Sequence, residues 1–459
     1  MSRRRLAGAA ASILAAGALV IANPLLPEAS ADDASLFVYR VAAASPEAAQ
    51  QLFADGYDVL ENRTGNDLYV LGDAATATRL RAKGFRPVVS EKLAAMGGTA
   101  PTTRLVPNAV APAMAPEDET YYGGYHTVTA QYAHLDKVAS TYPGLATVVD
   151  YGDSYLKTRN SATGYDLKAI CLTKKASGDC ALSPSAPKPR FLFMTQIHAR
   201  EIVTGDIAWR FIDYLAAGYG SNSAVTSLLD TTEVWVVPIA NPDGVDVVQQ
   251  GGTQPYLQRK NLNTSAGGSC ANPPTASNQA GVDLNRNSGI HWNESGTTSG
   301  PCTQTYAGTK ADSEPETLAI EGLFRKLFAD QRGTADTDAA PATARGAMIT
   351  MHSYAGMNLY PWGWSTKNSP NEAGLKAIAQ KMSTYNGYRN GQPGDILYNA
   401  AGGTDDWTYG ELGIASFTIE AASCNSFTPA YSCTAQDYAK NLPVLMYVAG
   451  IAGAPYRTS

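Results

Sequence analysis

The sequence contains little charge and little histidine, and beyond its first residues it has no long apolar run. Charged residues make up 17% of the 459 positions, and the formal net charge is −6 at pH 7. Lysine and arginine form no basic stripe, so we expect no nucleic acid among the partners. No stretch after residue 31 is apolar over the length that a bilayer requires, so we expect no membrane association. A hydrophobic share of 44% is typical of a folded globular protein.

The six cysteines lack the spacing of a metal cluster, in which ligands stand two to four residues apart. An even number of cysteines suits disulfide bonds in an oxidising compartment. They fall into three local pairs, which favours the bonds Cys171–Cys180, Cys270–Cys302 and Cys424–Cys433. Six cysteines allow many other connectivities, so this pairing is a preference among them.

The N-terminus has the features of an export signal. Residues 2–5 are Ser-Arg-Arg-Arg, residues 6–22 are apolar, and Ala29-Ser30-Ala31 is a small-residue cleavage site. The apolar run ends at Asn23-Pro24 and is short for a membrane anchor. We therefore expect residues 1–31 to be a signal peptide and the protein to be secreted and extracellular. The export route, general or twin-arginine, stays open.

Residues 32–97 alternate short strand-like and helical segments. The pattern predicts strands at 36–41, 58–60, 68–71 and 85–89, and helices at 46–54 and 74–83. This order is typical of a small α+β domain. The Ala-, Pro- and Thr-rich segment 98–117 is typical of a linker. A folded module between an export signal and a linker indicates a propeptide, with a permanent binding module as the alternative.

Residues 118–459 alternate apolar strands with longer helical segments. Strands are predicted at 146–151, 165–173, 190–196, 233–239, 346–352 and 416–420, and helices at 126–141, 201–215, 313–328, 371–385 and 435–451. Strands that are apolar throughout are buried on both faces. We therefore expect a single α/β domain, in which helices cover both faces of a mixed, mostly parallel, twisted sheet.

Two of the five histidines stand at the carboxyl ends of predicted strands. His198 follows strand 190–196 with Glu201 three residues later, and His352 ends strand 346–352. Open α/β sheets bind ligands at this edge, and two histidines with one glutamate are a common catalytic zinc site. From spacing alone, a charged helix start at Glu201 and a buried core histidine at His352 explain the pattern equally well.

Seven motifs follow one another along the chain: His198-Ala-Arg-Glu201, Asn241-Pro-Asp-Gly244, Arg259-Lys260, Gly281-Val-Asp-Leu-Asn-Arg-Asn287, His352-Ser-Tyr354, Tyr398 with Gly402-Gly-Thr-Asp-Asp-Trp407, and Ser416-Phe-Thr-Ile-Glu420. In this order they resemble the zinc metallocarboxypeptidase family, which includes the pancreatic carboxypeptidases A and B and secreted bacterial zinc carboxypeptidases. The resemblance covers residues 118–455. The module at 32–97 is similar to the inhibitory propeptide of that family.

The resemblance implies one Zn²⁺ ion, with a position left for water and three protein ligands: His198, Glu201 and His352. Asp283 would accept a hydrogen bond from the other ring nitrogen of His198. Glu420 would be the general base, inside an otherwise apolar strand where a structural ion pair is the alternative. Arg259 would stabilise the oxyanion that forms beside the metal.

The resemblance also implies how the substrate binds. Arg286 with Asn285 would bind the free C-terminal carboxylate, and Tyr398 would close over the substrate. Arg200 would contact the substrate further upstream, unless it is paired with a nearby acid. Asp405 occupies the position that lines the side-chain pocket, which implies acceptance of Lys and Arg ends. The small residues around it leave room for hydrophobic ends as well, and a solvated Asp405 is the alternative.

We therefore expect a secreted zinc carboxypeptidase that acts on the C-termini of peptides and proteins. It would be a monomer made as a zymogen, inhibited by its own propeptide and activated by another protease. A zinc amidase that acts on cell-wall peptides stays open as an alternative. A non-catalytic peptide-binding module is another, but it would require a lost ligand or base, and none is missing from the sequence.

Some features depart from the family pattern. The interval between Glu201 and His352 is longer than in the pancreatic enzymes, and insertions near 264–281 and 334–345 account for it. We expect these insertions to form rim loops that restrict access. The dipeptide His291-Trp292 is not part of the pattern either.

Overall fold

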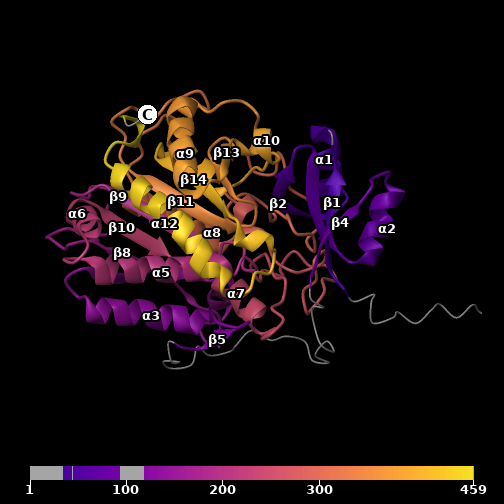
Figure 1. Cartoon of the computed structure of the whole chain (residues 1–459), viewed down its shortest axis with the longest axis horizontal. Coiled ribbons are helices and arrows are strands. Elements are labelled where there is room, and N and C mark those ends of the chain that lie inside the picture. Colours follow the sequence, from indigo (N-terminus) through magenta and orange to yellow (C-terminus); the bar gives the residue numbers. More distant parts are fainter. Residues whose placement is uncertain (1–34, 44, 94–117, 458–459) are drawn as a thin grey trace, which may run out of the picture.

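A computed structural model of the chain describes residues 35–43, 45–93 and 118–457. The signal peptide expected at 1–31 and the linker expected at 98–117 lie outside the described residues. Figure 1 shows a small N-terminal unit, in indigo, beside a larger α/β unit. The small unit has its own four-stranded sheet, and the large unit is built on a sheet of eight strands.

The N-terminal unit contains the elements that the sequence predicts, in the predicted order. They are β1 (Phe37–Ala42), α1 (Pro46–Ala54), β2 (Asp58–Thr64), β3 (Asp67–Gly72), α2 (Ala74–Ala82) and β4 (Val88–Lys92). The strands are antiparallel in the order β2-β3-β1-β4. The side chains of Ser45 and Asp73 accept hydrogen bonds from backbone N–H groups in the first turns of α1 and α2, which is why these helices begin there.

The eight-stranded sheet has the order β13-β12-β14-β11-β9-β10-β8-β7. Its strands are β7 (Ala146–Asp153), β8 (Asp166–Leu172), β9 (Arg190–Thr195), β10 (Glu233–Val237), β11 (Ala347–Ser353), β12 (Met357–Leu359), β13 (Arg389–Gly391) and β14 (Ala415–Ala421). The central strands β10, β9, β11 and β14 are parallel, whereas β8, β7 and β12 run antiparallel to their inner neighbours. The mixed sheet is the one expected.

Helices cover both faces of this sheet. They are α3 (Val128–Thr141), α4 (Tyr155–Arg159), α5 (Val203–Gly218), α6 (Ser223–Thr231), α7 (Pro242–Gln249), α8 (Pro315–Leu327), α9 (Glu372–Asn386), α10 (Pro393–Ile396), α11 (Thr404–Leu412) and α12 (Cys433–Ile451), with a hairpin of β5 (Thr120–Tyr121) and β6 (Tyr125–His126). Along β9, Phe191 and Phe193 join the core under α5, α9 and α12, whereas Leu192 and Met194 join the core under α8 and α11. The strand is buried on both faces, as its apolar run predicts.

The three favoured disulfide bonds are all present: Cys171–Cys180, Cys270–Cys302 and Cys424–Cys433. The second bond closes a long loop that contains the 3-10 turn Leu284–Arg286. Across the described parts of the chain, no helix combines the length and the hydrophobicity needed to cross a membrane.

Candidate active site

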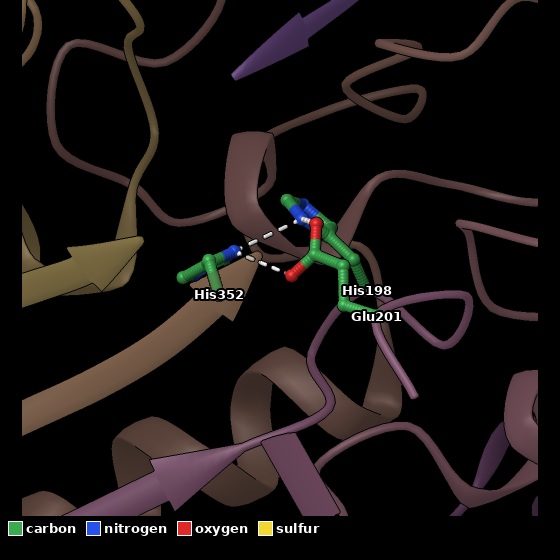
Figure 2. A group of neighbouring side chains, drawn as sticks. All are labelled: His198, Glu201 and His352. Carbon is green, nitrogen blue, oxygen red and sulfur yellow. Dashed lines mark hydrogen bonds and ion pairs between the residues drawn. The ribbon is translucent and has the colours of Figure 1, made fainter. Parts of the chain in front are cut away.

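Three potential metal ligands meet at the carboxyl edge of β9 and β11 (Figure 2). Nδ1 of His198 lies 2.8 Å from a carboxylate oxygen of Glu201, and Nδ1 of His352 lies 3.1 Å from the other. The two Nδ1 atoms are 3.1 Å apart, and all three side chains are buried. Glu201 was expected at the start of a helix, but α5 begins at Val203. The Glu201 side chain therefore comes from the turn between β9 and α5.

These three donors fit a metal ion. Two imidazole nitrogens that face each other at 3.1 Å have room for one proton at most, and both also face a carboxylate. Two histidines and a glutamate are a donor set that zinc takes in catalytic sites, with one position left for water. Within the residues that the structure describes, no other cluster of His, Cys, Asp and Glu meets the same geometric condition.

Asp283 fixes the orientation of His198. One of its oxygens lies 3.1 Å from Nε2 of His198, and the other accepts a hydrogen bond of 3.0 Å from Nε of Arg259. Burial alone would raise the pKa of this carboxyl, but Arg259 and His198 hold it well below its usual range. The ionised Asp283 thus holds an N–H on Nε2 and leaves Nδ1 free to bind a metal.

Glu420 lies on β14 and pairs in register with His352 on β11. Its side chain lines the same pocket as both histidines. Burial, followed by the nearby Glu201 and Glu61 carboxylates, raises the pKa of Glu420 well above its ordinary value. Its Oε2 atom has no hydrogen-bond partner among the described residues. A buried carboxyl with a raised pKa and a free oxygen is suited to accept and return a proton.

Four of the five residues expected to bind the substrate, all but Arg200, line this pocket together: Asn285, Arg286, Tyr398 and Asp405. Asn285 and Arg286 come from the 3-10 turn after Asp283, and Asp405 lies in the first turn of α11. Nε of Arg286 donates to the carbonyl of Gly296 at 3.0 Å, which fixes the plane of the guanidinium. Tyr398 packs edge-on against Phe53 of α1, with ring centroids 4.7 Å apart.

Asp405 is buried in the pocket rather than solvated, since only 7% of its surface is exposed. One of its oxygens accepts from the hydroxyl of Thr418 at 2.9 Å, and the other accepts from the N–H of Asp406 at 3.0 Å. Burial and the adjacent Asp405 raise the pKa of Asp406 well above its ordinary value. The hydrogen bonds from Thr418 and Asp406 thus fix the position of the Asp405 carboxyl group in the pocket.

The N-terminal unit contributes two acids that the sequence did not lead us to expect. Asp58 on β2 pairs with both terminal nitrogens of Arg200, at 2.6 and 2.8 Å. Glu61 on the same strand lies 2.7 Å from the guanidinium of Arg259 and lines the pocket. All four side chains are buried, so here Arg200 has the acidic partner that was the alternative to substrate contact. Strand β2 is mostly polar in sequence, so no local pattern indicated that these two acids would be buried against arginines.

Comparison with known proteins agrees with this geometry. A family model described as zinc carboxypeptidase matches residues 131–441. The chain belongs to this zinc carboxypeptidase family. Carboxypeptidase B2 of Homo sapiens is 29% identical over 317 residues, which cover 67% of this chain and 65% of the relative. Carboxypeptidase A2 of Rattus norvegicus is 31% identical over 306 residues, which cover 65% and 63%. The matched region therefore spans slightly less than two thirds of these relatives.

The fold of this zinc carboxypeptidase family member is also that of a solved relative. The crystal structure of carboxypeptidase A from Helicoverpa armigera superposes with a TM-score of 0.68 at 22% identity. It covers 92% of this chain and 98% of the other. The family resemblance and the fold class predicted from the sequence are thus confirmed.

Proposed function

We propose that the protein is a secreted zinc-dependent exopeptidase that hydrolyses the C-terminal peptide bond of peptides and proteins. The observation that carries this proposal is the meeting of two kinds of group in one pocket. A donor set for zinc, formed by His198, Glu201 and His352, lies beside the Arg286 guanidinium, which suits a free carboxylate. Three disulfide bonds support an extracellular location.

His198, Glu201 and His352 would hold a zinc ion, which would supply polarisation of the scissile carbonyl and a more acidic water. Glu420 takes a proton from the attacking water and passes it to the leaving amine. Arg259 donates hydrogen bonds to the oxygen on which negative charge develops. Asp283 holds the His198 ring in place throughout.

Different groups recognise the carboxylate and the side chain of the C-terminal residue. Arg286 and Asn285 bind its carboxylate, and Tyr398 closes over it. Asp405 accepts a hydrogen bond from the basic end of a Lys or Arg side chain, which makes these the preferred C-terminal residues. Gly363 and Gly403 leave space in the same pocket for hydrophobic side chains. Substrates with hydrophobic C-terminal residues are therefore also hydrolysed, but more slowly than those that end in Lys or Arg.

Residues 32–97 act as an inhibitory propeptide, and the chain is a zymogen. The pairs Asp58–Arg200 and Glu61–Arg259 support this, because they occupy two arginines that the substrate needs. Phe53 also packs against Tyr398 and keeps it from the substrate. Cleavage in the linker at 98–117 by another protease releases the propeptide and leaves an active monomer of residues 118–459.

The test is peptide hydrolysis by the processed protein. Blocked dipeptides that end in Arg, Lys, Phe and Leu are incubated with and without a zinc chelator, and the released amino acid is measured. We expect rapid release of Arg and Lys, slower release of Phe and Leu, and loss of all activity with the chelator. A parallel set with a D-residue or a γ-linkage tests for a cell-wall amidase. The proposal fails if no L-dipeptide is hydrolysed in a chelator-sensitive way.

A further inference from the structure

Two features of the sequence have no role in the proposed function: the dipeptide His291-Trp292 and the insertion at 334–345. They meet in the structure. Nε2 of His291 lies 3.1 Å from the carboxylate of Asp336, and Nδ1 lies 3.0 Å from that of Glu294. Each ring nitrogen of His291 thus faces a carboxylate. The insertion is thereby fastened to the loop that follows Arg286.

The His291 ring also covers Trp364. The two rings are stacked, with centroids 3.6 Å apart and planes 13° from parallel. The residue before Trp364 is Gly363, which lines the substrate pocket. The N–H groups of Gly363 and Trp364 donate to Asp406, at 2.8 and 3.0 Å. His291 therefore packs on the loop that forms one wall of the pocket.

Residues 291–296, which we call the strut, connect this wall to Arg286. At one end, the His291 ring lies on Trp364, and the hydroxyl of Ser295 donates to the Trp364 carbonyl at 3.1 Å. At the other end, the carbonyl of Gly296 accepts the 3.0 Å hydrogen bond from Nε of Arg286. The strut thus touches both the pocket wall and the guanidinium proposed to bind the substrate carboxylate.

No helix or strand stabilises the strut. The backbone φ angles of His291, Asn293 and Gly296 are 48°, 63° and 63°. They lie in the left-handed region, which residues other than glycine rarely adopt. Such a backbone persists only where its surroundings hold it. For the strut, the stack on Trp364 and the pair with Asp336 are contacts of this kind.

We propose that His291 is a positioning residue for substrate recognition, acting with Asp336 from the insertion. By holding the strut, His291 keeps Arg286 and the Gly363 wall at a spacing that fits a free carboxylate together with a long basic side chain. This inference rests on the proposed function, because it assigns the same pocket to the same substrates. It concerns recognition alone, since neither His291 nor Asp336 lines the pocket that contains His198, His352 and Glu420.

The test compares three variants with the wild type, each made as the full chain and then processed. His291→Ala removes the stack and the contact with Asp336, Asp336→Asn alters that contact at an exposed position, and His291→Phe keeps a ring on Trp364. The matched control is His134→Ala on α3, since His134 also stacks on a tryptophan (Trp209, 3.7 Å) and pairs with an aspartate (Asp213, 3.1 Å) but does not line the pocket. KM and kcat are measured for dipeptides that end in Arg, Lys and Phe.

We expect His291→Ala to raise KM about three- to tenfold and to leave kcat within about twofold, because an interaction that serves binding equally in the ground and transition states affects KM alone. The increase is larger for Arg and Lys than for Phe, since the longer side chains must reach Asp405. Asp336→Asn gives a smaller increase, His291→Phe restores part of the loss, and His134→Ala changes nothing.

Unchanged KM values in both His291→Ala and Asp336→Asn overturn this inference while the wild type still hydrolyses the dipeptides. A fall in kcat without a rise in KM also overturns it. If the wild type itself releases no amino acid, the proposed function fails, and this inference fails with it. Melting temperatures of all variants separate a loss of folding from a loss of recognition.

Discussion

The two halves of the site are built in different ways. Most of the proposed catalytic half comes from neighbouring parallel strands: His198 follows β9, His352 lies on β11, and Glu420 lies on β14 in register with His352. The recognition half comes from loops and first turns, and its residues are held by side-chain contacts. Asp405 is held by Thr418, and Arg286 is held by the strut.

This difference separates chemistry from specificity. A sheet fixes its side chains through a continuous ladder of backbone hydrogen bonds, so a substitution in the catalytic half changes the chemical step and little else. Loops depend on a few individual contacts, so a substitution in the recognition half changes which substrates bind. Each prediction below tests one side of this comparison.

The largest effect is expected from Glu420→Gln. Removal of a general base that serves both proton transfers lowers kcat by about a thousandfold or more. KM and bound zinc stay the same, because Glu420 is neither a metal ligand nor a carboxylate-binding group. Steady-state assays on the processed enzyme measure kcat and KM, and metal analysis measures the bound zinc. Activity within tenfold of the wild type would contradict the assigned mechanism.

The contact between the two units is tested by Asp58→Asn together with Glu61→Gln. Removing one partner of a buried ion pair is strongly destabilising, at about 3–5 kcal/mol for a single pair. We therefore expect the uncleaved chain to hydrolyse dipeptides about a hundredfold faster than the uncleaved wild type. Asp67→Asn is the matched control, since Asp67 pairs with Arg40 in the same unit at a more exposed position. Equal activity of the double variant and the control would argue against these pairs as the inhibitory contact.

Specificity is tested by Asp405→Ser. We expect kcat/KM for Arg ends, relative to Phe ends, to fall by about 30-fold or more, because a buried charge in the substrate loses its partner. Asp405→Asn separates charge from shape, since its amide oxygen still accepts from Thr418. The assignment is wrong if both variants keep the preference of the wild type.

Sequence patterns alone indicated only part of the proposed catalytic half and none of the recognition half. Apolar runs identified β9, β11 and β14, and the positions at or just after strand ends drew attention to His198 and His352 before any family was considered, whereas the roles of Arg259 and Glu420 came from the resemblance. Loops have no periodic signal, so the candidate roles of Tyr398 and Asp405 came from resemblance alone.

Local sequence patterns also could not predict contacts between segments that lie far apart in the chain. The strand containing Asp58 was predicted, but its pairing with Arg200, which lies far along the chain, was not. The short helices α7 and α11 were missed as well. They begin at Asn-Pro-Asp-Gly and Gly-Gly-Thr-Asp sequences, whose glycine and polar content hides a helical period.

Of the four tests of this comparison, the smallest effect is expected where the two halves meet, at Asp283. Its carboxylate contacts His198 in the catalytic half, and it accepts from Arg259 and from the N–H of Asn285 at the start of the recognition half. Asp283→Asn keeps an acceptor for one of these donors but places an amide N–H₂ against another.

Loss of such a carboxylate behind a metal-binding histidine typically costs 10- to 100-fold in metal affinity or activity. We expect a decrease of about tenfold in zinc affinity, measured against a competing chelator. Unlike Glu420→Gln and Asp405→Ser, this variant should change kcat and KM together, because one side chain supports both halves. A change in only one of the two constants would mean that the halves are positioned independently.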